Sequence, residues 1–167
     1  MAEVLRSPAC RAASADAHAT AKNVFVCHSH RDVDALQRLM VHLRPIERRG
    51  LVDIWADDRL AAGDKWRDEI RKALGRSSVA ILLISADFLA SDFIAEYELP
   101  RLLRKAEGQG TRIIQVILKP CRFSRDRDLA RFHAVNDPMR PLVTMSVGEQ
   151  EAVYDQIAHI VERLVAS

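Results

Sequence analysis

The chain has 167 residues, of which 49% are hydrophobic and 29% charged, so it is long enough for one globular domain with a full core. Its formal net charge of +2 argues against a nucleic-acid-binding protein, because its arginine-rich stretches are also interleaved with acidic residues. No apolar stretch approaches the ~20 residues that a membrane helix needs, and the N-terminus lacks the layout of a secretory signal. The three cysteines, Cys10, Cys27 and Cys121, form no CxxC motif, which favours reduced thiols in a cytoplasmic protein.

The sequence divides into a short arm and one domain. Residues 1–22 are rich in Ala and Ser without a sustained apolar period, so we expect a flexible arm, followed by the domain at 23–167. Apolar runs typical of strands occupy residues 24–27, 51–55, 79–84, 112–118 and 142–145. Apolar residues at helical spacing predict helices at 32–44, 65–74 and 153–164, with a short helix at 129–133. Pro45 and Gly50 are expected to end the first helix.

Strands that alternate with helices indicate βαβ units and a parallel sheet. Right-handed crossovers leave few arrangements of such units. The sequence therefore predicts an α/β fold, a flavodoxin-like open parallel sheet of about five strands with helices on both faces. In such sheets, ligands bind at the carboxyl ends of the strands where the strand order reverses. We expect the ligand crevice at the carboxyl ends of the first and third strands.

Residues 79–98 hold the strongest signal of a functional site. The unbroken apolar run at 79–84 is typical of a strand buried on both faces of a parallel sheet. Polar residues then turn the chain, and a helix-like segment carries Glu96 and Glu98. Pro100 disfavours the helical conformation at Leu99, so we expect a turn that ends near Glu98 and a second helix that begins at Pro100. This break predicts that Glu98 lies at a helix junction facing the crevice.

Segments along most of the chain resemble, in order and spacing, the Toll/interleukin receptor (TIR) domain in its bacterial form. The resemblance covers residues from about 23 to 164. It is carried by VFVCHSHRD at 24–32, HLRPIERRG at 42–50, WAD at 55–57 with Gly63 and Trp66, SADFLASDF at 85–93 with Glu98, and RIIQVILKPC at 112–121. The chain departs from the family pattern at Cys27 (usually Ser), His28 (usually Tyr), Asp58 (usually Arg), Ala62 (commonly Pro) and Ile94 (usually Cys). These departures concern loop contacts and substrate geometry rather than the fold.

The resemblance implies one of two functions. Some TIR domains are protein-interaction modules, and others, including many bacterial ones, split NAD+ at the nicotinamide–ribose bond. The resemblance assigns Glu98 as the catalytic carboxylate and NAD+ as substrate, with no cofactor. Cleavage generates an oxocarbenium-like ribose that a carboxylate stabilises. Because the pyridinium leaving group departs neutral, no general acid is needed, so one carboxylate suffices. Glu96 faces differently from Glu98 on a helix, and the family match selects Glu98.

The loop after the first strand helps, by resemblance, to line the NAD+ site. His28 and Arg31 lie in this loop and are candidate substrate-binding residues, and Arg31 is suited to the pyrophosphate. The alternative is a partly buried histidine and a surface arginine. Asp57 is also assigned to substrate binding, within a segment at 57–63 that resembles the family's BB loop. In the family, this loop gates the NAD+ pocket and mediates TIR–TIR contacts.

Three further residues are candidates for contact with the substrate. Ser85 follows the third strand and is a candidate partner for a ribose hydroxyl. Trp66 is a candidate border of the substrate, and Phe93 a candidate for stacking on a ring of the ligand. For both aromatic residues, packing within the fold is the alternative interpretation.

The resemblance also implies partners and a setting. We expect other TIR domains as partners in a homo-oligomer that activates the site, in bacterial immune or defence signalling, and we expect neither nucleic acid nor a membrane. A non-enzymatic TIR scaffold that recruits other TIR domains is the alternative.

Other classes that share this fold fit less well. A receiver domain, whose Lys-Pro ending resembles Lys119-Pro120, needs an acidic pair after the first strand, where this chain has CHSH at 27–30. A dinucleotide-cofactor domain needs a Gly-rich loop there. His28 and His30 lack a third ligand, so no metal site is expected.

Overall fold

The computed structural model of the chain describes residues 21–56 and 64–167. In these residues, a parallel sheet of four strands has the order β2-β1-β3-β4. The strands are β1 (Lys22–Cys27), β2 (Val52–Ala56), β3 (Ser77–Ile84) and β4 (Arg112–Ile117). The predicted α/β class with a flavodoxin-like parallel sheet is thus confirmed. Residues 1–20 of the predicted arm lie outside the described residues. The segment at 57–63, which includes Asp57, also lies outside them.

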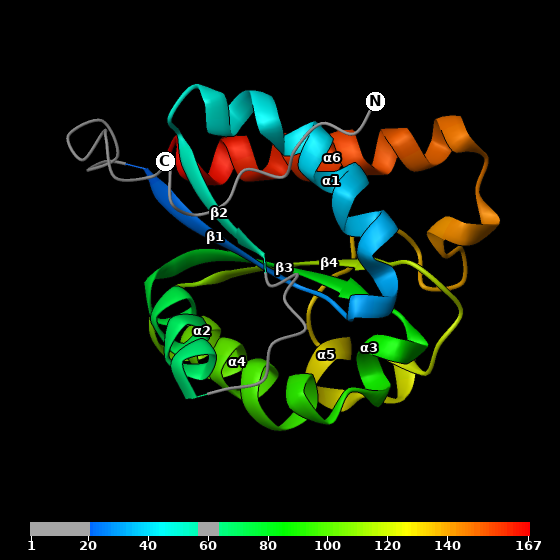
Figure 1. Cartoon of the computed structure of the whole chain (residues 1–167). Helices are drawn as coiled ribbons and strands as arrows, with labels where there is room; N and C mark the ends of the chain where they lie inside the picture. The colour runs from blue at the N-terminus through cyan, green and yellow to red at the C-terminus, as the bar shows by residue number, and fades with distance from the viewer. Residues whose placement is uncertain (1–20, 57–63) are drawn as a thin grey trace.

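Helices cover both faces of the sheet (Figure 1). On one face lie α1 (Val33–Arg48) and α6 (Val147–Val165). On the other lie α2 (Asp64–Arg76), α3 (Ala86–Ala90), α4 (Leu99–Gly108) and α5 (Arg127–Ala130). Shorter turns are η2 (His30–Asp32), η3 (Ile94–Glu98), η4 (Phe123–Arg125) and η5 (Leu142–Thr144).

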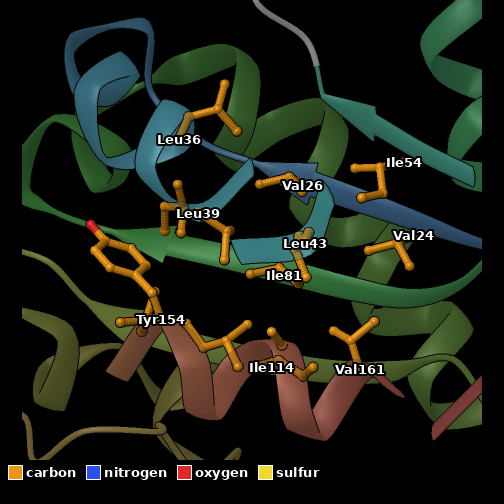
Figure 2. Close-up of a cluster of buried hydrophobic side chains, with 14 of the residues drawn as sticks. Val24, Val26, Leu36, Leu39, Leu43, Ile54, Ile81, Ile114, Tyr154 and Val161 are labelled. Carbon is orange, nitrogen blue, oxygen red and sulfur yellow. The ribbon is translucent and has the colours of Figure 1, made fainter. Parts of the chain in front are cut away.

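The sheet separates two apolar clusters because its central strands are buried on both faces. Side chains of β1 and β3 alternate between the clusters: Val24, Val26 and Ile81 face α1 and α6 (Figure 2), whereas Phe25 and Leu82 face the opposite layer. An unbroken apolar run is what such a strand requires. The run at 79–84 was therefore a reliable predictor of β3.

The chain order of the strands defines the crevice. From β1 the chain crosses to β2 on one side and then to β3 on the other, so the strand order reverses between β1 and β3. Cys27 of β1 is aligned with Leu82 of β3, close to the carboxyl end of both strands. The switch point thus lies at the carboxyl ends of the first and third strands, and a ligand crevice there stays a prediction.

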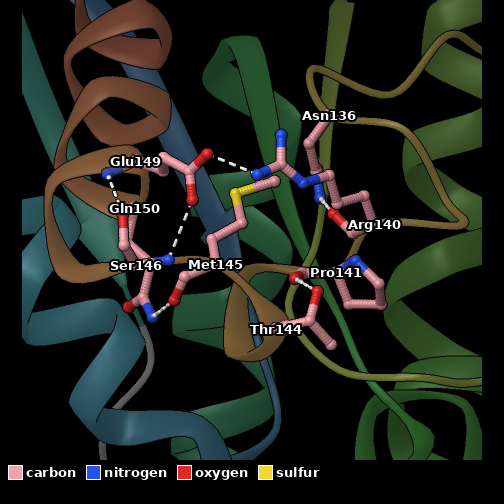
Figure 3. Close-up of polar contacts among 8 residues, drawn as sticks. All are labelled: Asn136, Arg140, Pro141, Thr144, Met145, Ser146, Glu149 and Gln150. Atoms are coloured by element: carbon pink, nitrogen blue, oxygen red, sulfur yellow. Dashed lines mark hydrogen bonds and ion pairs between the residues drawn. The ribbon is translucent and has the colours of Figure 1, made fainter.

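The predicted fifth strand at 142–145 is wrong, and the segment instead begins with the turn η5. The backbone N–H and the hydroxyl of Thr144 both donate to the carbonyl of Pro141, at 3.0 and 2.7 Å, which closes the turn (Figure 3). The outer edge of β4 is covered by an earlier segment. Val135 donates to the Gln115 carbonyl, and the amide side chain of Asn136 bonds both N–H and C=O of Ile117. The segment at 142–145 therefore reaches the sheet only beyond the end of β4, where the N–H of Val143 donates to the carbonyl of Leu118 at 3.0 Å.

Two helix boundaries also differ from the prediction. Helix α1 continues past Pro45 to Arg48, and Gly50 follows with a φ of 73°. Proline has no N–H to donate to the carbonyl of Val41, four residues earlier. Because Pro45 and Val41 are both exposed, water can bond this carbonyl instead. Helix α6 begins at Val147 rather than 153, because Ser146 and Glu149 form a reciprocal capping box (Figure 3).

Candidate active site

The carboxyl edge of the sheet brings together side chains from well-separated parts of the chain. His28 follows β1 directly, Ser85 follows β3, and Lys119 comes two residues after β4. Glu98 reaches this edge from η3, and its Oε2 lies 2.7 Å from the Sγ of Cys27, the last residue of β1. The structure therefore places the predicted catalytic carboxylate at the strand end that borders the switch point.

Glu98 is 4% exposed, whereas Glu96 is exposed to solvent. Residues two apart on a helical turn face different directions, which accounts for the difference. The predicted break in the helix lies directly after Glu98. Residues Ile94–Glu98 form a single π-helical turn, in which the N–H of Leu99 bonds the carbonyl of Ile94, and Pro100 lies in the first turn of α4. Proline has no N–H for the next helical bond, so a wider turn fits here. Such π-turns often occur at functional sites.

A second buried group lies at the same edge and was not predicted. Asp32 ends η2 and is 3% exposed. Its Oδ1 accepts a hydrogen bond from Lys119 Nζ at 2.7 Å, and its Oδ2 accepts one from the hydroxyl of Ser85. The bond to Asp32 raises the pKa of Lys119 above its usual value. The ion pair and the hydrogen bond from Ser85 together link the segments that follow β1, β3 and β4.

Ser85 has a structural role in this arrangement. Its hydroxyl donates to Asp32 and accepts from the N–H of Phe88 at 3.0 Å, which caps helix α3. Its exposed fraction is 0%. The Ser85 oxygen can still accept one more hydrogen bond, but a ribose hydroxyl would reach this buried side chain only after a local rearrangement, so its contact with substrate stays a prediction.

The two candidate residues after β1 differ in exposure. His28 is 8% exposed, next to Cys27 in the chain. Arg31 lies in η2 with its side chain exposed, and its backbone N–H bonds the side chain of Ser29 at 3.3 Å. The guanidinium of Arg31 is thus open to an anion in solvent, whereas the imidazole of His28 is part of the interior.

Trp66 and Phe93 belong to a stack of aromatic rings between α2 and the η3–α4 segment. The ring centroids of Trp66 and Phe93 are 4.7 Å apart, and those of Phe93 and Tyr97 are 5.1 Å apart. The guanidinium of Arg101 lies 3.7 Å from the centre of the Tyr97 ring. The packing role is therefore present, and since Trp66 and Phe93 are only partly buried, contact with a ligand stays a prediction.

Two surface hollows in the described residues lie away from Glu98. One is lined by Cys121, Arg122, Ser124 and Arg125. The other lies beside β2 and α2, where Asp53, Trp55 and Glu69 are among its lining residues. Neither hollow includes the buried carboxylate. We regard Glu98 as the centre of the candidate site, because the strand order and the burial of a carboxylate both point to it.

Comparison with known proteins identifies the family. Residues 24–143 match the model of the TIR domain, which is most of the chain. The chain belongs to the TIR domain family, and the resemblance inferred from its motifs is confirmed.

Two individual proteins are also similar to the chain. An uncharacterized protein, y4lF, of Sinorhizobium fredii (strain NBRC 101917 / NGR234) is 30% identical over 99 residues. The match covers 59% of this chain and 31% of that protein, so the chain spans less than a third of its length. TIR domains in the structure of the activated Roq1 resistosome, which directly recognizes the pathogen effector XopQ, align with a TM-score of 0.48 and 16% identity. That alignment covers 88% of this chain and 85% of the other.

One observation concerns membranes. In the described ranges 21–56 and 64–167, no helix is both long and apolar enough to cross a bilayer.

Proposed function

We propose that this TIR domain cleaves NAD+ at the bond between nicotinamide and ribose, with Glu98 as the catalytic carboxylate. The observation that carries the proposal is the placement of Glu98. The residue is 4% exposed, and its carboxyl group lies at the carboxyl end of β1, beside the switch point of a parallel sheet. A buried carboxylate at a ligand-binding edge is uncommon unless it has a task there.

The chemistry requires one anionic group. The bond from ribose C1′ to the pyridinium nitrogen breaks, and its electron pair leaves with nicotinamide, which becomes neutral. Positive charge develops on the ribose, where the carboxylate of Glu98 stabilises it. Water then adds to C1′ and releases a proton, which gives ADP-ribose. In a cyclic product, a nucleophile of the same molecule replaces the water. Charge stabilisation is strongest where solvent is excluded, as it is around Glu98.

The burial of Glu98 also supports control by assembly. A carboxylate that is 4% exposed is too enclosed for a ribose to touch it without a local rearrangement. By family resemblance, contact with a second TIR domain provides this rearrangement and opens the NAD+ pocket. Substrate then reaches Glu98 only in the oligomer. Asp57, His28 and Phe93 would line the opened pocket, and the exposed Arg31 would bind the pyrophosphate.

The family resemblance suggests the setting. Depletion of NAD+, or release of a cyclic nucleotide signal, suits a defence response inside the bacterial cytoplasm. A domain of this kind needs a trigger, and the proposed trigger is self-association.

Nicotinamide release tests the proposal. The purified protein is incubated with NAD+ at high protein concentration or with a crowding agent, and release is followed by chromatography. We expect release that rises more steeply than protein concentration. Glu98→Ala is expected to abolish it, and Glu96→Ala, which changes an exposed carboxylate two residues away, is expected to preserve it.

Other results would point elsewhere. If Glu96→Ala is the inactive variant, the site assignment is wrong. No release by the wild-type protein under any assembly condition would favour a TIR scaffold that recruits other TIR domains.

A further inference from the structure

The contact between Cys27 and Glu98 links a strand to the candidate catalytic group across 71 residues of sequence. The Sγ of Cys27 donates to Oε2 of Glu98 at 2.7 Å, and the two residues are 1% and 4% exposed. A carboxylate removed from water needs hydrogen-bond donors, because leaving it without them costs several kcal/mol. The thiol of Cys27 is one donor that the fold supplies.

The surroundings of this contact are apolar. Cys27 belongs to the cluster on the α2, α4 and α5 face of the sheet, together with Phe88, Ile94 and Leu99. Ile94 begins η3, which carries Glu98, and Leu99 follows it directly. In such surroundings a hydrogen bond strongly influences where a carboxylate points, since competing partners in bulk water are excluded.

The donor is also held more rigidly than the acceptor. Cys27 ends β1, where it is paired with Leu82 of β3, and the preceding residue, Val26, is paired with both β2 and β3. Glu98 instead ends a π-helical turn and has a longer side chain with more rotatable bonds. A rigid strand therefore fixes the end of a flexible side chain. Catalytic groups must be held within about 0.5 Å of their productive position, and contacts with neighbouring residues provide this support.

We propose that Cys27 is a positioning residue for Glu98: its thiol holds the carboxylate in the orientation that faces the ribose. The inference rests on the proposed NAD+ cleavage. The thiol does not touch the substrate and undergoes no covalent step. Its effect is on the transition state, where the direction of the carboxylate matters most, and not on the binding of NAD+.

Two substitutions separate positioning from packing. Cys27→Ser keeps a donor of similar size, and Cys27→Ala removes it. We expect kcat to fall about 30-fold in Cys27→Ala with KM within about twofold, because small misplacement of a reacting group costs about that much. Cys27→Ser is expected to retain kcat within about threefold. Cys121→Ala, which changes a partly buried cysteine of the same cluster, is the matched control and is expected to keep wild-type kcat.

An infrared measurement tests the contact without any need for turnover. In a Cys10→Ser, Cys121→Ser background, Cys27 gives the single S–H stretching band of the protein. A thiol that donates to a carboxylate absorbs at lower frequency than one that donates weakly. Glu98→Gln replaces the anionic acceptor by a neutral amide, so we expect the band to move to higher frequency. Glu96→Gln is expected to leave it in place.

The outcomes divide clearly. If the frequency of the S–H band does not change in Glu98→Gln, the contact is absent and the inference is overturned. If the band shifts but kcat is unchanged in Cys27→Ala, the contact exists but serves only packing, and the inference is also overturned. If Cys27→Ser loses as much kcat as Cys27→Ala, while both unfold at the wild-type temperature, donation is not the operative property. Absence of turnover in the wild-type protein contradicts the proposed function, and the infrared band alone then decides whether the contact exists.

Discussion

Lys119 Nζ lies 2.7 Å from Oδ1 of Asp32, although 87 residues separate them along the chain. The side chain of Asp32 is completely buried, whereas that of Lys119 is 44% exposed. Asp32 lies after the end of β1, and Lys119 lies after the end of β4. Ser85, which follows β3, donates a hydrogen bond to the same carboxylate of Asp32. The carboxyl edge of the sheet thus contains an ion pair, Asp32–Lys119, in addition to the Cys27–Glu98 contact.

Replacement of Lys119 by Met is expected to destabilise the domain. The substitution keeps most of the aliphatic stem but leaves the carboxylate of Asp32 buried without its cation. Loss of a charged hydrogen-bond partner typically costs about 2 kcal/mol in the free energy of unfolding. Urea denaturation measures the change, and Lys72→Met, at an exposed position of α2, is the control. A Lys119→Met protein as stable as the control would show that the ion pair contributes nothing.

The contact between α1 and α6 is expected to weaken in acid. Glu151 of α6 accepts from Arg38 Nε and Nη2 at 2.5 and 2.6 Å, and it lies 2.8 Å from His42 Nε2. Its hydrogen bond with Arg38, followed by that with His42, lowers the pKa of Glu151 to about 2. A carboxyl group with a depressed pKa in the folded state stabilises the fold above its unfolded pKa and loses that contribution as the pH falls through its folded pKa.

The stabilising effect of Glu151 should therefore be complete above about pH 5 and decline between its ordinary pKa, near 4.5, and a pH of about 2. Thermal unfolding of the wild-type protein and Glu151→Gln across this range tests the expectation. The difference in melting temperature between the two proteins should shrink as the pH falls. A difference that stays constant from pH 6 to pH 3 would contradict the role assigned to this carboxylate.

Phe93 is expected to have both a packing role and a substrate role. Its ring lies between those of Trp66 and Tyr97, so Phe93→Ala should lower the free energy of unfolding by about 2 kcal/mol. If the partly buried ring also contacts NAD+, KM should rise about tenfold. Denaturation and steady-state kinetics measure the two effects separately. Unchanged KM together with lowered stability would restrict Phe93 to packing.

The sequence predicted the elements that depend on local pattern. The run at 79–84 identified β3 because a strand buried on both faces has no polar residues to interrupt it. Pro100 identified the break beside Glu98 because proline lacks an N–H. The predicted strand at 142–145 failed for a non-local reason: Asn136 already occupies the edge of β4 through its side chain. Hydrophobic pattern alone does not reveal which segment reaches an edge first.

Prediction of the site had a similar limit. Glu98 was found through motif spacing, and the structure places it at the expected strand end. Asp32 was missed because an aspartate at the start of a helix is usually a cap on the surface. Only the fold brings Asp32 within reach of Lys119, although a lysine directly followed by proline after a strand was a visible signal. Cys27 stood out in the sequence only as a departure from the family pattern, and its contact with Glu98 depends on the turn η3.

The negative charge of Glu98 is the central element of this account, and Glu98→Gln tests it most directly, because the amide keeps the size and shape of the side chain. Nicotinamide release by assembled wild-type protein, Glu98→Gln and Glu96→Gln is the decisive measurement. We predict that Glu98→Gln lowers kcat about a thousandfold, since a group that stabilises transition-state charge has about that effect, and that Glu96→Gln stays within about twofold of wild type. A Glu98→Gln protein that releases nicotinamide at the wild-type rate would contradict the account.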